Sequence, residues 1–237
     1  MSDNQNIPSL DLADFLSGNE DQKMNFVQKL GKAYEEIGFV SIKNHGLSDT
    51  LCDSLYQEVQ NFFNLSTEQK AKYEIEGLAG QRGYTSFGKE HAKGRNTGDL
   101  KEFWHFGQYV EDNDPIIKEY PDNVLVDELP VFNTVGKEAY QTLEKAGQSM
   151  LRAIALYLGL DEFYFDSKIH NGNSILRPIH YPPIVGEPKD AVRAAEHEDI
   201  NLITLLMGAS AEGLEVMNKK GEYIAVTALP DHIVVNV

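Results

Sequence analysis

Cysteine is nearly absent from this sequence, since Cys52 is the only one among 237 residues. A single cysteine cannot form an internal disulfide, so a fold held by disulfides is excluded and a reducing compartment is favoured. Cys52 lies in a helical pattern, where a free thiol is more often a small buried side chain than a nucleophile. We therefore expect a cytoplasmic protein whose stability rests on one sizeable apolar core.

Basic charge and long apolar runs are also scarce. The chain has 21 Lys and Arg against 37 Asp and Glu, a formal net charge of −16. Nucleic-acid binding needs clustered positive charge, so this balance argues against a nucleic-acid partner. The apolar run from Leu202 to Met207, interrupted by Thr204, is far too short to span a bilayer. The first residues carry no Lys or Arg, so they do not predict a signal peptide. We expect no membrane partner.

The first part of the chain is predicted to be mainly helical. Apolar residues recur at helical spacing from Phe26 to Ile37, and Gly38 ends the run. A short buried strand follows at Phe39–Lys43, and a second helix has Leu51 and Phe62 at the two ends of its apolar face. Residues 80–107 are rich in glycine and mixed charge, and we expect a long loop that ends in a strand.

The most regular pattern predicts one long helix, followed by short strands. One apolar face is formed by Val135, Ala139, Leu143, Ala146, Met150, Ile154 and Tyr157. Gly159 suits the end of this helix. Several short β-type runs separated by turns then indicate a sandwich or jelly roll. Those runs are Ser174–Tyr181, Leu202–Met207, Leu214–Met217, Glu222–Val226 and Ile233–Val237.

The segment AEHEDINLITLL, residues 195–206, holds the strongest candidate for chemistry. Side chains alternate along a strand, so His197 and Asp199 point to one face, away from Glu196 and Glu198. An imidazole and a carboxylate on one face can bind a divalent metal, and this donor pair suits Fe(II) or Mn(II). One further histidine would complete a facial triad. The alternative is a charged strand entrance, which is the usual explanation for such a pair taken alone.

Several motifs in fixed order resemble one enzyme family along essentially the whole chain. The motifs are GFV at 38–40, NHG at 44–46, NFFNLSTEQK at 61–70, RGY at 82–84, DLKEFWHFG at 99–107, ILRPIHYPP at 175–183 and HEDINLITLL at 197–206. Together they resemble the isopenicillin N synthase-like branch of the Fe(II)/2-oxoglutarate-dependent dioxygenases. Each motif is weak by itself, whereas their common order is specific.

The resemblance implies an α+β fold, in which N-terminal helices surround a double-stranded β-helix (jelly roll). Residues 1–125 would form the N-terminal region, and 126–237 the long helix and the first part of the jelly roll. The family's iron ligands match His197 and Asp199. The implied cofactor is Fe(II), with 2-oxoglutarate and O2 as cosubstrates. The implied reaction oxidises a C–H bond of a small-molecule substrate and releases succinate and CO2.

Two further site residues follow from the resemblance with less support. Tyr181 matches a tyrosine near the 2-oxoglutarate end of the cavity, or it packs at a strand end before Pro182. Some members have an asparagine at the position of Ile179, so that contact is absent or replaced here. Arg177 would share a strand face with Tyr181 and could bind a substrate carboxylate as a bidentate fork. A structural ion pair is the favoured alternative for Arg177.

The family's third iron ligand and its 2-oxoglutarate-binding arginine would both lie beyond Val237, so we expect a fragment and a jelly roll incomplete at its C-terminal end. A partner chain or another residue completing the site is the alternative. His232 is the only histidine after the motif, and it falls upstream of the distal ligand. Three functions stay open: a 2-oxoglutarate-dependent oxygenase, a 2-oxoglutarate-independent Fe(II) oxidase of the same branch, and a catalytically silent jelly-roll binding module.

Overall fold

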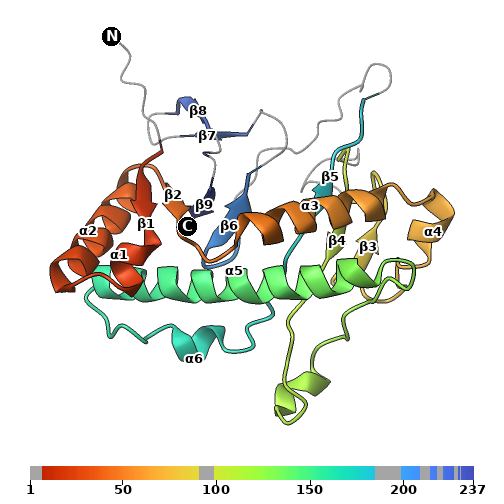
Figure 1. Ribbon diagram of the computed structural model, residues 1–237, viewed down its shortest axis with the longest axis horizontal. Helices are drawn as coiled ribbons and strands as arrows, with labels where there is room; N and C mark the ends of the chain where they lie inside the picture. Colours follow the sequence, from red (N-terminus) through yellow and green to blue (C-terminus); the bar gives the residue numbers. More distant parts are fainter. Residues whose placement is uncertain are drawn as a thin grey trace. The chain divides into compact units, whose positions relative to one another are not determined.

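The computed structural model describes residues 7–90, 99–184, 199–208, 214–217, 221–226, 229 and 231–237. Helices and short strands are mixed along the chain (Figure 1), as the predicted α+β class requires. The chain divides into two compact units that are interleaved in sequence. The first unit comprises Met1–Leu47, Thr142–His170 and Asp199–Val237, and the second comprises Ser48–Gln141 and Asn171–Glu198.

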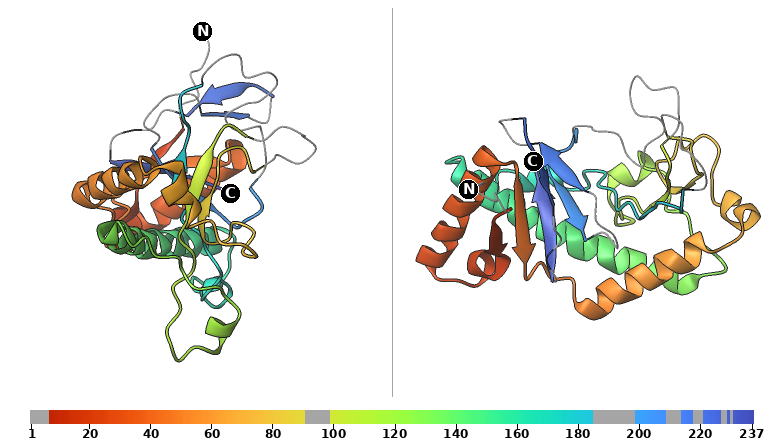
Figure 2. Two further views of the ribbon diagram at one scale, coloured as in Figure 1. Left: turned by 90° about the vertical axis from the view of Figure 1, so that its right-hand side faces the viewer. Right: turned by 90° about the horizontal axis from the view of Figure 1, so that it is seen from above.

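A four-stranded sheet organises the first unit. β2 (Phe39–Lys43) and β9 (His232–Asn236) are antiparallel neighbours at its centre. β1 (Ser9–Asp11) lies parallel to β2 at one edge, and β6 (Thr204–Met207) lies antiparallel to β9 at the other. Figure 2 shows β2, β9 and β6 side by side. A separate two-stranded ribbon is formed by β7 (Glu215–Met217) and β8 (Tyr223–Ala225).

The helix before β2 has strong start and stop signals. α2 (Glu20–Glu36) begins after Asn19, whose side chain accepts from the Gln22 N–H while the Gln22 side chain accepts from the Asn19 N–H. This capping box satisfies two backbone donors that the helix cannot pair itself. Gly38, just past the helix, has a φ of +84°, a conformation that glycine adopts without strain. The predicted helix and its glycine end are confirmed.

The sheet of the first unit buries one continuous apolar face. Val40 and Ile42 on β2 are fully buried, and Ile233 and Val235 are their neighbours on β9. Leu205 continues this face on β6, opposite Val235. α5 (Pro130–Tyr157) contributes its second half to this unit, together with the short helices α1 (Leu12–Leu16) and α6 (Asp166–Ile169).

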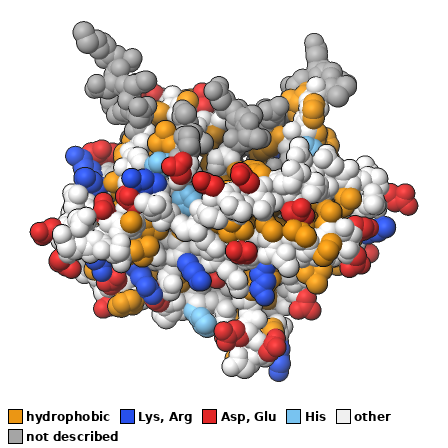
Figure 3. Space-filling model, in the orientation of Figure 1, with side chains coloured by type: hydrophobic (Ala, Val, Ile, Leu, Met, Phe, Trp, Pro, Cys, Tyr) orange, Lys and Arg blue, Asp and Glu red, His pale blue; other side chains and the backbone are white. Residues whose placement is uncertain are grey.

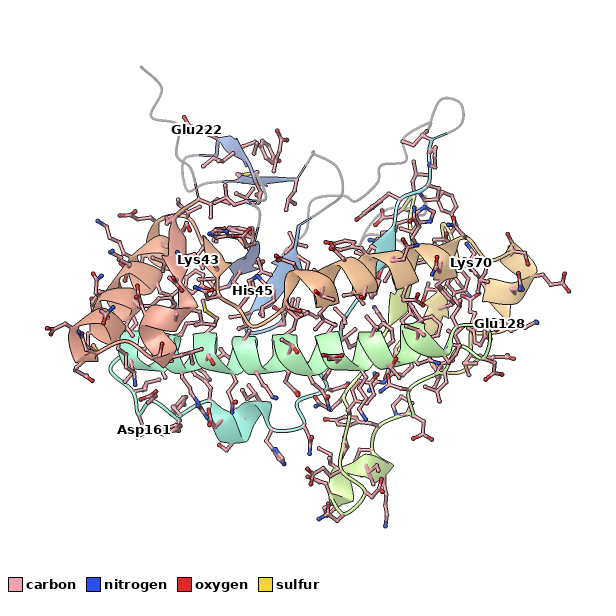
Figure 4. All side chains as sticks on the ribbon, in the orientation of Figure 1. Lys43, His45, Lys70, Glu128, Asp161 and Glu222 are labelled. Carbon is pink, nitrogen blue, oxygen red and sulfur yellow. The ribbon has the colours of Figure 1, made fainter. Side chains whose placement is uncertain are left out.

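The side chain of His45, which follows β2, forms a hydrogen bond with the backbone immediately before β9. The imidazole of His45 (labelled in Figure 4) accepts at Nδ1 from the Leu47 N–H, at 3.3 Å. Its Nε2 is therefore the protonated nitrogen, which donates to the backbone oxygen of Asp231 at 3.2 Å. His45 in the NHG motif thus has a structural role, joining two segments far apart in sequence.

The second unit contains a smaller sheet in the order β3-β4-β5, with antiparallel neighbours. Its strands are β3 (Gly83–Thr85), β4 (Glu102–His105) and β5 (Ile179–His180). The helices are α3 (Asp49–Phe63), α4 (Thr67–Ala71), the 3-10 helix η1 (Pro115–Lys118) and the first half of α5. The unit's core is aromatic: the ring of Phe62 lies 4.8 Å from Trp104 and 5.2 Å from Phe132, measured between centroids. Such ring contacts add to the free energy gained from burial alone.

Two sequence predictions need correction at this level. The run Ser174–Tyr181 is a strand only at Ile179–His180, with one isolated bridge between Leu176 and Phe106. Pro178 has no N–H to continue the ladder, although its carbonyl accepts from Trp104. The glycine-rich stretch 80–107 contains the additional strand β3. The sequence has no alternation of apolar residues there that would have predicted it. The long helix and its end before Gly159 are confirmed, as is the strand that ends residues 80–107.

None of the helices in the described ranges has the length and apolar content that crossing a bilayer requires. On the face shown in Figure 3, Lys and Arg side chains are interspersed with acidic ones. The Lys and Arg side chains therefore form no separate basic patch on that face.

Two helix glycines give opposite predictions for the same substitution. A β-carbon on Gly31 would lie 2.2 Å from ring atoms of Tyr157, whereas one on Gly147 would meet its nearest neighbour, Leu205, at 3.6 Å. We expect Gly31→Ala to lower the free energy of unfolding by about 1–3 kcal/mol, because the clash outweighs the gain in helix propensity. Gly147→Ala should raise it by up to about 1 kcal/mol. Urea unfolding of both variants checks the pair, and equal effects would contradict the packing at Gly31.

Candidate functional site

The predicted site residues fall in different parts of the structure. Asp199 belongs to the first unit, and Arg177 and Tyr181 belong to the second. His197 lies outside the described residues, so its role stays a prediction. Among the residues that the structure describes, no three His, Cys, Asp or Glu side chains are grouped to hold a metal ion.

Asp199 is held by the two strands at one edge of the first unit's sheet. Its Oδ2 accepts from the Thr204 hydroxyl at 2.6 Å and from the Asn236 amide at 2.9 Å. Thr204 on β6 and Asn236 on β9 are direct partners in the ladder, so their side chains reach Asp199 from neighbouring strands. The Asn201 amide donates in turn to the Thr204 oxygen, at 3.0 Å. An ionised carboxylate held by charge-assisted hydrogen bonds is a suitable ligand for a hard divalent cation.

His232 lies on β9 and contacts a different strand. Its Nε2 is 2.9 Å from the hydroxyl of Ser9. The sequence placed this histidine upstream of the family's distal ligand, and its observed contact is with β1. Neither observation makes His232 a metal ligand.

Arg177 makes the structural ion pair that the sequence favoured. Its Nη1 is 3.2 Å from Glu90 Oε1, its Nε donates to His105 Nε2 at 2.6 Å, and its guanidinium covers the ring of Phe103 at 4.4 Å. Hydrogen bond, ion pair and ring contact together fix the orientation of the guanidinium. The Arg177 side chain is nevertheless 37% exposed, so part of it faces solvent.

A buried lysine completes the charge balance around Arg177. Lys101 Nζ lies 2.7 Å from Glu90 Oε2 and 3.0 Å from Asp99 Oδ2. Burial opposes the charge, yet hydrogen bonds to Glu90 and Asp99 raise the pKa of Lys101. Burial also opposes ionisation of Glu90, but its contacts with Lys101 and Arg177 lower its pKa. Two cations thus face two carboxylates, and the cluster is neutral overall.

His105 is an uncharged member of the same cluster. Burial first, and then the charge of Arg177, lower its pKa to about 4. Because Nε2 accepts from Arg177, the proton of the neutral imidazole is on Nδ1, which donates to the Gly80 carbonyl. The neutral ring therefore connects Arg177 to the backbone before β3.

Tyr181 follows the short strand β5, and the charges that act on it differ from the contact that His180 makes. Burial raises the pKa of Tyr181; the charge of Lys101 lowers it and that of Asp99 raises it, with a net rise. The hydroxyl therefore stays protonated and can donate. His180 contacts instead the carboxylate of Glu102 at 2.8 Å. Glu102 is paired with Lys70 (labelled in Figure 4), also at 2.8 Å.

Lys70 and Glu102 form a buried ion pair that sequence reasoning missed. Their side chains are only 9% and 5% exposed, and Tyr84 also donates to Glu102. Burial raises the pKa of Glu102, but the bonds from Lys70, Tyr84 and His180 outweigh this and lower it. Lys70 and Glu102 each lie in one of the quoted motifs, but no spacing rule connects the two motifs.

Comparison with known proteins gives one consistent family. Residues 7–128 match the family model for the N-terminal region of the non-haem dioxygenase in morphine synthesis, and residues 172–237 match that of the 2OG-Fe(II) oxygenase superfamily. The 2-oxoglutarate-dependent dioxygenase imqE of Aspergillus flavus is 30% identical over 267 residues, covering 100% of this chain and 73% of the relative.

Solved structures agree with the sequence matches. A 2OG-Fe(II) oxygenase family protein from Caulobacter crescentus has a TM-score of 0.84 and 37% identity, covering 98% of this chain and 73% of that one. A full-length protein from Neurospora crassa, solved in complex with alpha-KG, has a TM-score of 0.83 and 29% identity, covering 100% of this chain and 74% of that one.

The neutral, buried state of His105 predicts a pH dependence of stability. Its pKa is about 4 in the folded protein and 6.5 as an unperturbed value, so the unfolded chain binds more protons between these values. The folded state is therefore destabilised as the pH falls below 6.5. We expect the free energy of unfolding to drop by about 2–3 kcal/mol between pH 7 and pH 4.5 through this residue.

His105→Gln should remove that part of the slope, because an amide can keep both hydrogen bonds without titrating. Urea unfolding at several pH values measures it. His170→Gln, at the end of the short helix α6, is the matched control for replacing a histidine outside this cluster. An unchanged slope in His105→Gln would contradict a neutral buried imidazole.

Proposed function

This chain belongs to the 2OG-Fe(II) oxygenase superfamily, and from that premise we propose that it oxidises a C–H bond of a small-molecule substrate. The family uses Fe(II) and 2-oxoglutarate, and we propose that the reaction of this chain releases succinate and CO2. The observation that carries the proposal is the Asp199 carboxylate, held by Thr204 and Asn236 within the matched region 172–237.

We propose His197 and Asp199 as iron ligands. The donor chemistry fits, because an imidazole nitrogen and a carboxylate oxygen suit Fe(II) in a facial arrangement. Bound iron would supply the oxidising chemistry, while the protein orients the ligands and shapes the cavity. The Asp199 carboxylate would contribute one negative charge toward the cation, and its hydrogen bonds to Thr204 and Asn236 keep it oriented.

We propose Tyr181 as a 2-oxoglutarate contact. Its phenol stays protonated because burial raises its pKa, so it can donate a hydrogen bond to a carboxylate. The neighbouring cations Lys101 and Arg177 are compensated by Asp99 and Glu90, which leaves the phenol as the donor that is not in an ion pair.

We propose that Arg177 contacts the substrate by exchanging Glu90, its present ion-pair partner, for a group of the substrate. A substrate carboxylate could replace Glu90, since both side chains of this pair are about one third exposed, at 37% and 32%. Bidentate pairing would favour such an exchange geometrically. The substrate class supported by this residue is a small molecule with a carboxylate. The Neurospora crassa relative has been solved with thymine and with 5-formyluracil, which are small molecules of a different kind.

We infer further that β6 to β9 belong to a double-stranded β-helix, and that residues 1–125 and 126–237 are the N-terminal and jelly-roll regions. The support is the antiparallel pairing of β9 with β6 and the ribbon β7-β8. The apolar face that β9 and β6 share is the kind of surface that a jelly roll buries.

Iron and cosubstrate binding test the proposal together. Anaerobic addition of Fe(II) and 2-oxoglutarate to the protein, expressed from its complete reading frame, should give the weak visible charge-transfer band of the bound pair. His197→Ala and Asp199→Ala should each abolish the band, because each removes a ligand.

His232→Gln is the matched control, since it replaces a histidine on β9 that contacts Ser9 rather than Asp199. It should keep the band. No band from the unmodified protein would sink 2-oxoglutarate dependence. Iron binding without the band would then favour the 2-oxoglutarate-independent oxidase, and no iron binding at all would favour a silent binding module.

If Tyr181 donates a hydrogen bond to 2-oxoglutarate, removing its hydroxyl should weaken 2-oxoglutarate binding by the contribution of that one bond. Tyr181→Phe should raise the dissociation constant for 2-oxoglutarate about two- to tenfold, corresponding to about 0.5–1.5 kcal/mol. Titration of the charge-transfer band measures it. Tyr164→Phe makes the same chemical change at a residue that is 43% exposed in the first unit, and it should have no effect. Equal affinities for all three proteins would remove Tyr181 from the site.

A further inference from the structure

We propose that Thr204 and Asn236 are positioning residues, which fix the carboxylate of Asp199 in the orientation that binds the metal. This inference rests on the proposed function, because it requires Asp199 to be a ligand. It assigns a role to Thr204, which lies within the motif HEDINLITLL, and to Asn236 on β9, 5 and 37 positions after Asp199 in the sequence.

The two hydrogen bonds converge on a single oxygen. Thr204 donates to Oδ2 of Asp199 at 2.6 Å, and Asn236 donates to the same Oδ2 at 2.9 Å. The donors come from β6 and β9, and the backbone register places them directly opposite each other. Two donors from neighbouring strands restrict the rotation of the carboxylate more than either donor could alone.

The Thr204 hydroxyl is itself oriented. The amide of Asn201 donates to the Thr204 oxygen at 3.0 Å, so that oxygen accepts from one side. The Thr204 hydroxyl has only one proton, and its contact with Asp199 Oδ2, at 2.6 Å, is shorter than its contact with Asn201 Oδ1, at 3.3 Å, so the proton is directed to Asp199. Threonine is also branched at Cβ, which restricts its χ1 and holds the hydroxyl in place. Asn201, Thr204 and Asp199 thus form a directed chain of hydrogen bonds.

These side-chain bonds are not needed to pair the strands. β6 and β9 already pair through their backbones over four residues, and β9 also pairs with β2 over its whole length. Asp199, by contrast, precedes β6 and is an exposed residue, so its side chain needs other contacts to be fixed. Ordering such a side chain in advance removes an entropy cost from metal binding. Loss of comparable outer-shell partners typically lowers metal affinity about 10- to 100-fold.

Metal affinity, measured without cosubstrate or oxygen, tests the inference directly. Co(II) is added to the protein expressed from its complete reading frame, and the dissociation constant is obtained by competition with a chelator. Thr204→Val should raise this constant about tenfold, and Asn236→Leu should do the same. Thr204→Ser restores the hydroxyl and should stay within about twofold of the unmodified protein. The visible Co(II) spectrum should change in Thr204→Val and recover in Thr204→Ser.

Thr134→Val is the matched control, since the Thr134 hydroxyl bonds only to the Val131 carbonyl within α5 among the bonds seen here. It should leave the constant unchanged. Thermal unfolding of each metal-free variant separates metal affinity from stability, and Asn236→Leu tests the inference independently if Thr204→Val does not fold.

The outcomes distinguish this inference from the proposed function. If Asp199→Ala loses Co(II) binding while Thr204→Val and Asn236→Leu, both folded, bind it normally, the positioning role is overturned and the metal site stands. If Asp199→Ala binds Co(II) as tightly as the unmodified protein, the proposed function fails at that residue. Weakened binding in Thr204→Val with rescue by Thr204→Ser supports the positioning role.

Discussion

The antiparallel pairing of β9 with β2 and β6 is the contact on which the first unit depends. It joins residues 39–43 to residues 232–236, and it places β6 on the other side of β9. Closing so long a loop costs entropy, which the burial of Ile233, Val234 and Val235 must offset. The side chains at the centre of β9 are buried on both faces of the strand. Its terminal residue, Asn236, donates a hydrogen bond to the side chain of Asp199.

This pairing links the stability of the fold to the position of Asp199. Asp199 has its position because Thr204 and Asn236 are neighbours across the ladder, and they are neighbours because β9 is fixed by β2. His45 strengthens the same arrangement by bonding the backbone at Asp231, immediately before β9. A shift of β9 by one residue would turn Asn236 to the opposite face and remove its bond to Asp199.

Charge in the second unit follows a different rule. The chain is strongly acidic, yet the buried carboxylates of Glu102 and Asp99 are each paired with a lysine. Leaving a buried charge without its partner costs far more than the pair contributes, so such pairs restrict the packing more than they stabilise it. Glu102 lies on β4, which pairs through its backbone with β3 and β5, and Asp99 precedes β4. Net charge alone could not have revealed this organisation.

Local patterns predicted the elements whose causes are local. The α5 helix was evident because its apolar residues recur over many turns, and Gly38 and Gly159 marked helix ends through their freedom at positive φ. β3 and the shortness of β5 were not evident, because proline and glycine interrupt any alternation there. The pair His197 and Asp199 was found from strand geometry and family resemblance, and it stays a prediction. Thr204 and Asn236 were missed because only the tertiary pairing of β6 with β9 brings them to Asp199.

Diffraction from crystals of the Fe(II)-loaded protein, recorded at the iron absorption edge, tests the central claim most directly. We expect one anomalous peak within bonding distance of the Asp199 carboxylate and the His197 imidazole, with Thr204 and Asn236 still bonded to Asp199. An iron peak bound elsewhere, with Asp199 turned away from it, would contradict the proposed metal site.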